Sequence, residues 1–549
     1  MDKKLKDPIY GYISIPVEII KNVVDTAGFQ RLRRIVQTSY APLYSSAVHN
    51  RFVHSIGVFH LGRIASGKLQ QEILKKGYCE RDVLENYVQI YQYACLLHDV
   101  GHAPFSHTGE GFYKTEDYSS RELHTKLLEV VGNSEFSRDI PIEESRAAAA
   151  HEIMSCIVGI QEFGGILLKD SQSKEFFARC ITGYQYSSGN DDGSIKNCFI
   201  SMLNSKVIDV DRLDYLIRDA YFTGFETVNI DYLRLLNALT IVKEEGKYQI
   251  AYHKDALSII ENAIYAHDAE KKWIQNHPAA IYEGYLIKHI ITHLNETLNN
   301  EQNKLFSLKA LGGVGGNLKN NIHVSLLCDD DIIYLSKNLY SDEIGKEFFE
   351  RKSRRHPVWK SEAEYKAYIE ELSSAGRLKD EFLDCLKSFV GGNQKDMQEP
   401  IAINKALEEK IERELRESEE LLKHSEDETE KKSFEQQQKG AKNRLNFCRY
   451  LNKYAKEHDL DGDFIVIRTD MFNSAFSKDE ITKLLIVFKQ DGEEKIKRLS
   501  EVCPTLKAEK IQEEFYYLYY RSGKKGKIHS KEAFCRGMYL AAHSLAAME

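Results

Sequence analysis

The stretch YACLLHDVGHAPFSH, residues 93–107, indicates both the fold and the chemistry of this chain. Its first half places apolar residues at the three- and four-residue spacings of a buried helix, which ends at His98-Asp99. The loop that follows carries His102 and His107. Ionisable groups at a buried helix end are costly unless they are paired, so such a cluster usually holds a metal ion or an anion.

The dipeptide His-Asp also occurs at residues 267–268 and 458–459, so the pair alone is a weak signal. Only His98-Asp99 ends an apolar helix and continues into further histidines. We therefore expect metal binding at the first pair and not at His267 or His458.

Two other helical stretches offer matching ligands. HNRFVHSIGVFHLGRIA (49–65) presents His54, and VIDVDRLDYLIRD (207–219) presents Asp211 among apolar residues. Taken singly, His54 is typical of a core histidine and Asp211 of a helix cap. Together with the first pair they complete a set that would hold one divalent ion, such as Fe, Mn, Zn or Mg, with positions left for water and substrate. The set is His54, His98, Asp99 and Asp211.

The rest of the chain favours a mostly α fold, with a helical core over residues 1–300. A helical connecting region is expected over 301–460. Within it, residues 404–440 carry 12 acidic and 8 basic residues, and an apolar stripe with a spacing of four runs along their start, so a projecting or paired helix is predicted. The stripe consists of Ile403, Leu407, Ile411 and Leu415.

Residues 461–549 are expected to form a small α+β C-terminal lobe. The segments 464–472 and 483–490 are predicted strands, because they are short apolar runs rich in β-branched residues. The segments 509–521 and 530–546 are predicted helices.

Composition excludes several classes of protein. The 549 residues include 75 Lys and Arg against 83 Asp and Glu, a net charge of −8, so nucleic acid is not an expected partner. Ten cysteines without a CxxC pair argue against a disulfide scaffold and fit a reducing compartment. Neither a signal-peptide core nor a run of about 18 apolar residues occurs, so we expect a cytoplasmic protein that does not span a membrane.

The motifs HNRFVHSIGV, LLHDVGHAPFSH and DVDRLDYLIRDAYFTG occur in this order. They resemble those of the HD-domain deoxynucleoside triphosphate (dNTP) triphosphohydrolases, in particular the sterile-alpha-motif and HD-domain dNTP hydrolases and their bacterial relatives. The similarity covers about residues 7–222 and returns over about 464–520, which look like the family's regulatory and assembly lobe. The resemblance implies metal-dependent hydrolysis of a dNTP to deoxynucleoside and inorganic triphosphate.

The same resemblance implies roles for further residues. His102, His107, Glu110 and the histidine of a His-Glu pair would flank the α-phosphate of the substrate; that histidine is His151, with His124 as a rival. Phosphate and sugar contacts are implied for Gln37, Arg51, Arg212, Tyr215 and Asp219. Without the resemblance, Arg51 and Arg212 would be interpreted as surface or intra-helix ion pairs and Tyr215 as a core residue.

Regulation is implied as well. Asp25, Gln30 and Arg33 resemble residues that read the guanine of an activating nucleotide, GTP or a dNTP; alternatively, they begin an ordinary amphipathic helix with Asp25 as N-cap. A homo-oligomer, tetramer or dimer, would follow, and a second Mg could accompany the substrate phosphates. The rival functions are hydrolysis of a nucleoside monophosphate, cyclic nucleotide or alarmone by an HD enzyme, and a nucleotide-sensing assembly protein.

Overall fold

The structure is a computed structural model. It describes residues 2–38, 42–110, 120–140, 148–205, 208–226, 229–298, 317–318, 322–323, 327–338, 343–351, 354–369, 376–390, 401–424, 428–460, 463–470, 472, 474–475, 479–490, 493–503, 514–523 and 526–542.

The chain forms two compact units, each built from three separate segments. Unit 1 contains Met1–Gln275, Ile290–Leu339 and Asn473–Lys510, and unit 2 contains Asn276–His289, Tyr340–Phe472 and Ile511–Glu549. The expected division at residues 300 and 460 therefore differs from the observed one. In particular, the C-terminal stretch that we expected to be one lobe is shared between the two units.

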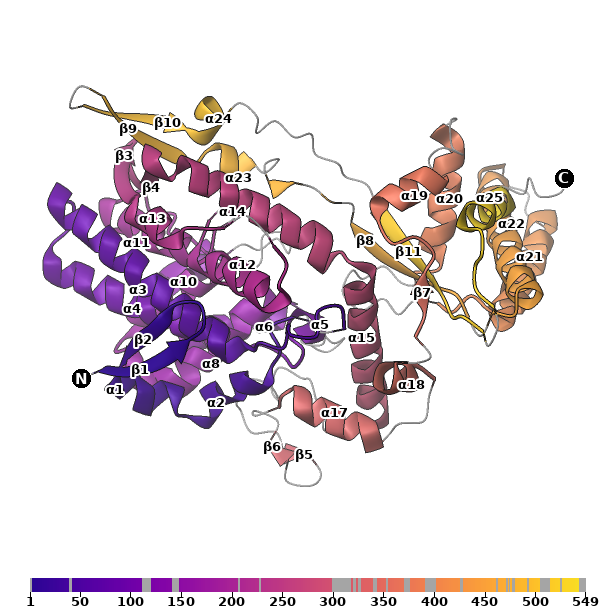
Figure 1. Cartoon of the computed structure of the whole chain (residues 1–549), viewed down its shortest axis with the longest axis horizontal. Helices are drawn as coiled ribbons and strands as arrows, with labels where there is room; N and C mark the ends of the chain where they lie inside the picture. Colours follow the sequence, from indigo (N-terminus) through magenta and orange to yellow (C-terminus); the bar gives the residue numbers. More distant parts are fainter. Residues whose placement is uncertain are drawn as a thin grey trace. The chain divides into compact units, whose positions relative to one another are not determined.

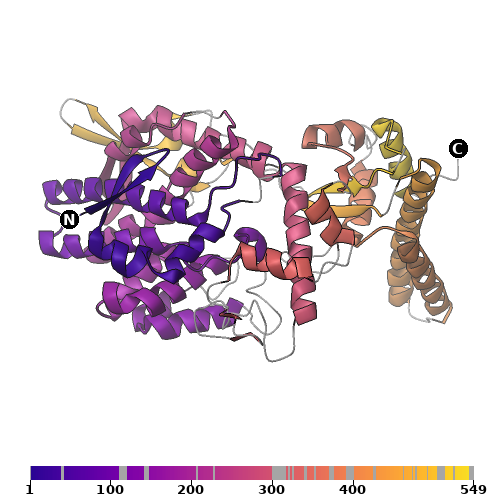
Figure 2. The same ribbon diagram turned by 60° about the horizontal axis from the view of Figure 1, so that its bottom comes forward.

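Unit 1 is mostly helical, as the sequence predicted, and its two longest helices, α3 and α4, lie side by side (Figures 1 and 2). Leu61, Leu69, Tyr91 and Leu97 on these helices are fully buried, so the core of the unit includes this contact. The helices of the unit include α3 (Arg51–Lys76), α4 (Arg81–Leu97), α5 (His107–Glu110), α6 (Ser120–Val131), α7 (Ser134–Asp139), α8 (Ala150–Val158), α9 (Gly164–Leu167), α10 (Ser171–Thr182), α11 (Asp191–Leu203), α12 (Val210–Thr223), α13 (Tyr232–Asn237), α14 (Leu257–Glu270) and α17 (Asp329–Asn338).

A four-stranded sheet at one side of unit 1 joins residues far apart in the chain (Figure 1). Its order is β10-β9-β4-β3, and β4 pairs with β9 in parallel. The hairpin β3–β4, which the sequence reading missed, turns at Glu245 and Gly246, both at positive φ. The strands are β3 (Leu239–Glu244), β4 (Lys247–His253), β9 (Leu485–Gln490) and β10 (Glu493–Arg498), with α23 (Asp479–Thr482) and α24 (Leu499–Val502) beside them in the sequence.

The N-terminal segment is a hairpin of β1 (Asp2–Asp7) and β2 (Gly11–Pro16), followed by short helical pieces. Residues 17–37 have the apolar spacing of a helix, but the structure divides them into short pieces. A break occurs where the Thr26 hydroxyl accepts from the Phe29 N–H and starts a new turn. The pieces are α1 (Val17–Ile19), a π-helical turn (Ile20–Val24), α2 (Ala27–Gln30) and a 3-10 turn (Arg31–Arg34).

Unit 2 packs helices around the three-stranded sheet β7-β11-β8. The helix predicted over residues 509–521 is wrong, because Glu514–Tyr520 form strand β11 in the middle of this sheet. Six of its seven residues are buried, so the strand lacks the alternation that marks a one-sided strand. The other elements include β7 (His356–Pro357), β8 (Ile465–Asp470), α18 (Glu343–Glu350), α19 (Glu362–Ile369), α20 (Gly376–Ser388) and α25 (Lys531–Ala542).

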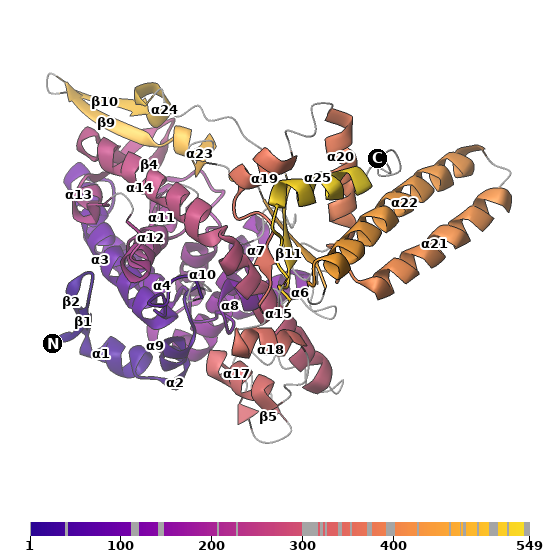
Figure 3. The same cartoon turned by 45° about the vertical axis from the view of Figure 1, so that its right-hand side comes forward.

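The charged segment 404–440 covers the first helix of a helical hairpin in unit 2 and the start of the second. Figure 3 shows α21 (Lys405–His424) and α22 (Glu428–Glu457) side by side, as the paired-helix prediction required. Ile411 of the predicted apolar stripe is 1% exposed, and the Glu412 carboxylate accepts from Arg449 of the second helix at 2.5 Å. The apolar stripe therefore packs inward, while charged side chains link the two helices.

A membrane-crossing helix is not found: among the described residues, every helix is too short or too polar.

Candidate active site

Helix α3 brings two charged or polar side chains into the interior at its first turn. Asn50 caps the helix, because its side-chain oxygen accepts from the Val53 N–H at 3.2 Å. Arg51 and His54 follow on the buried face and are 3% and 0% exposed.

The end of α4 provides the next pair. His98 terminates the helix and Asp99 begins the turn that leads to His102. Gly101 is required here, because a Cβ atom at this position would lie 2.4 Å from the backbone of α8. Its N–H donates to Ser155 Oγ at 3.0 Å, so the turn lies directly against the helix that carries His151.

Helix α12 carries the fourth expected ligand, Asp211. Asp209, rather than Asp211, caps this helix by accepting from the Arg212 N–H at 2.7 Å. Asp211 and Asp214 then face α3 together. Gly57 on α3 permits this approach, since a Cβ atom there would lie 2.0 Å from Asp214 Oδ1.

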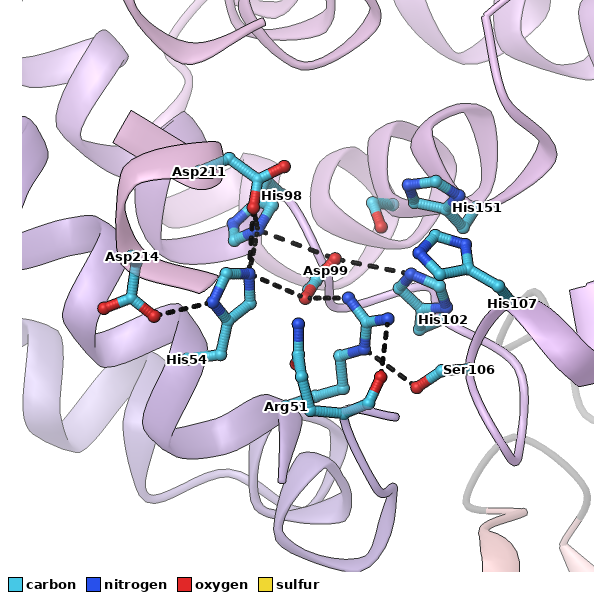
Figure 4. A network of polar contacts seen from close by, with 12 residues as sticks. Arg51, His54, His98, Asp99, His102, Ser106, His107, His151, Asp211 and Asp214 are labelled. Carbon is cyan, nitrogen blue, oxygen red and sulfur yellow. Dashed lines mark hydrogen bonds and ion pairs between the residues drawn. The ribbon is translucent and has the colours of Figure 1, made fainter. Parts of the chain in front are cut away.

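Three of the four expected metal ligands, His54, His98 and Asp99, offer ligand atoms that all lie within 4.8 Å of one another, and Asp211 meets this group through the two histidines (Figure 4). His54 Nε2 lies 3.2 Å from His98 Nε2, 3.0 Å from Asp211 Oδ1 and 3.5 Å from Asp99 Oδ2. A metal ion with ligand bonds of about 2.1 Å would place neighbouring ligand atoms about 3.0–3.4 Å apart. The observed spacing therefore fits a single divalent ion.

The hydrogen bonds of the two Nδ1 atoms also indicate a cation site. His98 Nδ1 must donate to the Cys95 carbonyl at 2.9 Å, and His54 Nδ1 donates to the Asp214 carboxylate at 2.7 Å. In the neutral rings both Nε2 atoms are then acceptors, and they face each other and two carboxylates. Such a group of acceptors needs a positive charge, which either a metal ion or a proton on one Nε2 atom supplies.

Electrostatics support this requirement. Burial opposes protonation of His54, yet its hydrogen bonds to the carboxylates of Asp211 and Asp214 raise its pKa to about 10. The same negative field would stabilise a cation. Asp211 is the most exposed of the four ligands, with 39% of its side chain accessible, so the cluster is open to solvent on that side.

Arg51 is not the surface ion pair that the alternative interpretation assumed. Its guanidinium donates to Asp99 Oδ2 at 2.8 Å, to Ser106 Oγ at 2.9 Å and to the Gln37 carbonyl at 3.3 Å. Burial raises the pKa of Asp99, but Arg51 and the nearby histidines outweigh it and hold that pKa below the usual range. Arg51 therefore keeps a ligand ionised.

A second cluster lies beside the first (Figure 4). The His102 and His151 rings stack with centroids 4.2 Å apart, and His107 meets both edge-on at 5.0 and 5.1 Å. Glu110 accepts from His107 Nδ1 at 3.0 Å and lies 2.9 Å from His151 Nδ1. His102 Nε2 is 3.5 Å from Asp99 Oδ1, which joins the two clusters.

The two stacked imidazoles differ in charge. Burial disfavours the imidazolium of His151, but the Glu110 carboxylate overcomes this and raises the pKa to about 9. Burial, followed by the charge of Arg51, lowers the pKa of His102 well below its usual value. His151 is therefore a cation at neutral pH and His102 is neutral. The rival His124 bonds to the Tyr184 hydroxyl at 3.0 Å.

The residues implied to contact the substrate differ in their burial and in their hydrogen-bond partners. Arg212 Nε donates to the Tyr215 hydroxyl at 3.3 Å, a hydrogen bond within α12. Asp219 is 1% exposed and pairs with His49 at 2.7 Å. The side-chain oxygen of Gln37 is buried and has no hydrogen-bond partner among the described residues.

The expected regulatory residues lie on one short stretch. Asp25 and Arg33 are exposed, and Gln30 accepts from Arg33 Nε at 2.8 Å. The Arg33 guanidinium lies 3.5 Å above the Phe52 ring. Asp25 is not the N-cap of α2, because Thr26 occupies that position.

The other two His-Asp pairs lie in different surroundings. Asp268 accepts from the backbone N–H of Ala475 at 2.7 Å, and His458 stacks on Tyr454 at 3.8 Å. His458 Nδ1 also lies 3.1 Å from the Tyr454 carbonyl.

Sequence reasoning missed the group that orients His54. Asp214 accepts from Tyr10 at 2.8 Å and from Arg218 at 2.9 and 3.0 Å, and Arg218 also bonds to Asp7 at 3.0 Å. Spacings of three and four between Asp211, Asp214 and Arg218 place all three on one helix face, which is the signal that could have revealed them.

Metal binding can be tested by a graded pair of variants. Asp211→Asn should abolish metal binding, because it removes one of four ligands, whereas Asp214→Asn should weaken it about 10- to 100-fold by releasing the His54 ring. Metal titration followed by elemental analysis checks both. His267→Ala is the matched control and should retain full metal content; loss of metal in that variant, or full retention in Asp211→Asn, would contradict the assignment.

Residues 51–155 match the HD domain family. The chain is 30% identical over 262 residues to an uncharacterized protein of Mycoplasma genitalium, a match that covers 47% of this chain and 52% of that protein. It is 30% identical over 249 residues to the deoxynucleoside triphosphate triphosphohydrolase SAMHD1 homolog of Dictyostelium discoideum, covering 44% of this chain and 40% of that protein. The chain thus spans about half the length, or less, of these curated relatives.

A crystal structure of a hypothetical protein from Aquifex aeolicus has the same fold. It aligns over 99% of this chain and 100% of its own, with a TM-score of 0.52 and 17% sequence identity. Residues 51–155 of this chain are therefore an HD domain, and the chain is a relative of proteins that include a named deoxynucleoside triphosphate triphosphohydrolase.

Proposed function

We propose that this protein is a metal-dependent HD phosphohydrolase that cleaves dNTPs to deoxynucleoside and inorganic triphosphate. The observation that carries the proposal is that the two clusters are in contact. Asp99, one of the expected metal ligands, lies next to His98 in the first cluster and next to His102 in the second. A ligand set beside an imidazole and imidazolium pair suits a reaction in which negative charge develops on a phosphate.

A divalent ion held by His54, His98, Asp99 and Asp211 would supply positive charge and Lewis acidity at the phosphorus under attack. The protein's own groups would do the rest. His151 would donate a proton to the leaving oxygen. The Glu110 carboxylate would keep the imidazole protonated until that step. Neutral His102 would donate a hydrogen bond to a phosphate oxygen without adding charge next to the metal.

The dNTP class is supported by the named relative and by the residues around the clusters. The side-chain oxygen of Gln37 has no partner within the part of the chain that the structure describes, and Asp219 is a buried carboxylate, so both could accept from sugar hydroxyls. Arg212 and Tyr215, on the same helix as Asp211, would contact phosphates. All five substrate contacts, Arg51 included, remain predictions from the sequence.

The reaction is tested by product analysis. Protein loaded with Mn or Fe is incubated with each dNTP, alone and in mixtures, and the products are separated by anion-exchange chromatography. The proposal requires deoxynucleoside and intact triphosphate, with no product from Asp211→Asn. Release of single phosphate or of pyrophosphate would instead indicate a different HD phosphohydrolase, and a protein that binds dNTPs without turnover would be a sensor.

The proton on His151 predicts a pH dependence. A group with a raised pKa keeps its proton below that pKa, so activity that needs the imidazolium should be lost as pH rises through about 9. Glu110→Gln removes the carboxylate that raises this pKa, so the alkaline limb should move to lower pH. Rates measured from pH 6 to 10 for both proteins check this; an unchanged limb in the variant would exclude His151 as the proton donor.

We further propose that nucleotide regulates the enzyme through Asp25, Gln30 and Arg33. The exposed carboxylate and guanidinium are suited to the edge of a guanine. If one nucleotide contacts two copies of the chain, binding would stabilise a dimer or tetramer by mass action.

Arg33→Ala should therefore raise the nucleotide concentration that is needed for both assembly and turnover, while metal content stays at the parent level. Light scattering and activity are followed across a GTP titration. Lys21→Ala, at an exposed position in the preceding turn, is the matched control. A parent enzyme that is equally active at all GTP concentrations would overturn the regulatory proposal and leave the catalytic one intact.

A further inference from the structure

The start of α17 lies against the histidine turn of the active site. Asp329 is 5% exposed, although aspartate is rarely buried without partners. Its Oδ1 accepts from the Phe105 N–H at 2.6 Å, and its Oδ2 accepts from the Val36 N–H at 2.8 Å. One carboxylate therefore joins two segments that precede it in the chain by more than two hundred residues.

The turn that Asp329 holds has an unusual backbone. Phe105 and Ser106 have φ values of +58° and +54°, in the left-handed region that side-chain-bearing residues rarely adopt. Two such residues in succession persist only where the surroundings determine the conformation. This turn reverses the chain between His102 and His107, so its shape sets the positions of two histidines of the second cluster.

Arg31 ties the same segment to the other end of the turn. Its Nε donates to the Leu327 carbonyl at 2.6 Å and its Nη2 to the His102 carbonyl at 2.6 Å. A longer bond of 3.4 Å reaches the Val100 carbonyl. Residues 327–329 are thus connected to the turn twice, directly through Asp329 at Phe105 and indirectly through Arg31 at His102.

These residues form a closed ring of hydrogen bonds. The Ser106 hydroxyl donates to the Val36 carbonyl and accepts from Arg51 Nε, and Arg51 in turn donates to the Gln37 carbonyl. The Asp329 carboxylate completes the ring through Val36 and Phe105. Arg51 and Gln37 are both expected to contact substrate, so this ring of hydrogen bonds connects expected substrate-binding residues to the histidine turn.

We propose that Asp329 is a positioning residue that holds the histidine turn and the Val36–Gln37 segment in the geometry needed for turnover. This inference rests on the proposed function. Asp329 does not reach the reacting atoms, and it acts through the backbone of Phe105 and Val36. It should therefore govern kcat more than substrate affinity or metal content.

The carboxylate is needed because both of its oxygens accept from backbone N–H groups. In Asp329→Asn one of these positions becomes an amide nitrogen, a donor that faces another donor, so one bond is lost. The next residue provides a matched control. Asp330 is 61% exposed and pairs with the exposed Arg34 at 2.6 Å, so Asp330→Asn removes the same charge without touching the turn.

Two measurements test the inference on the full-length, metal-loaded protein. Hydrogen exchange of peptides that cover residues 100–107 should be faster in Asp329→Asn than in the parent, because the Phe105 amide loses its acceptor. Steady-state kinetics with a dNTP should show kcat reduced about 10- to 100-fold, with KM and metal content within about twofold of the parent. Asp330→Asn should match the parent in every respect.

Arg31→Lys serves as a second variant should Asp329→Asn fail to fold. A lysine can reach only one of the two carbonyls, so the same drop in kcat with faster exchange over residues 100–107 is expected. Unchanged exchange, or faster exchange with unchanged kcat, would overturn the positioning role. If the parent itself hydrolyses no dNTP, the proposed function fails, and the exchange comparison between Asp329→Asn and Asp330→Asn alone decides whether Asp329 holds the turn.

Discussion

The candidate site in unit 1 depends on one electrostatic constraint: four hydrogen-bond acceptors, from α3, α12 and the end of α4, lie together and need a positive charge between them. His54 and His98 donate outward, to Asp214 and to the Cys95 carbonyl, so neither ring can offer a proton inward without becoming charged. The residues around the cluster satisfy the same constraint. Arg218 and Tyr10 balance Asp214, Arg51 balances Asp99, and Gly57 leaves room for α12 to approach α3.

The sequence could predict which side chains lie together at the candidate metal site, because metal-binding residue types stood at helix ends or within apolar helical patterns. The groups that orient the ligands were harder to find. Asp214 is one of several acidic residues in its helix, and Asp329 lies in a region without a recognisable motif. Their function depends on contacts between distant parts of the chain, which local spacing does not encode. The assignment of His151 over His124 remains a prediction, although His151 is the one that stacks on His102.

The same contrast applies to the fold. Long amphipathic helices such as α4, α12 and α21 could be predicted from their periodicity, because one face packs and the other contacts water. Strand β11 could not, since burial on both faces removes the alternation and its aromatic run suits helix and strand patterns alike. The segment 17–37 has helical spacing, but a local side-chain bond at Thr26 interrupts it.

The discontinuous make-up of unit 1 has a consequence for its synthesis. Strand β4 ends at His253, but its parallel neighbour β9 begins only at Leu485. While the ribosome translates the intervening residues, the nascent chain carries a β-edge whose N–H and C=O groups lack their final partner. Such an edge can pair with another chain. The protein therefore has a long vulnerable interval before its N-terminal unit is complete, and a chaperone that covers β4 during that interval would act on a defined edge.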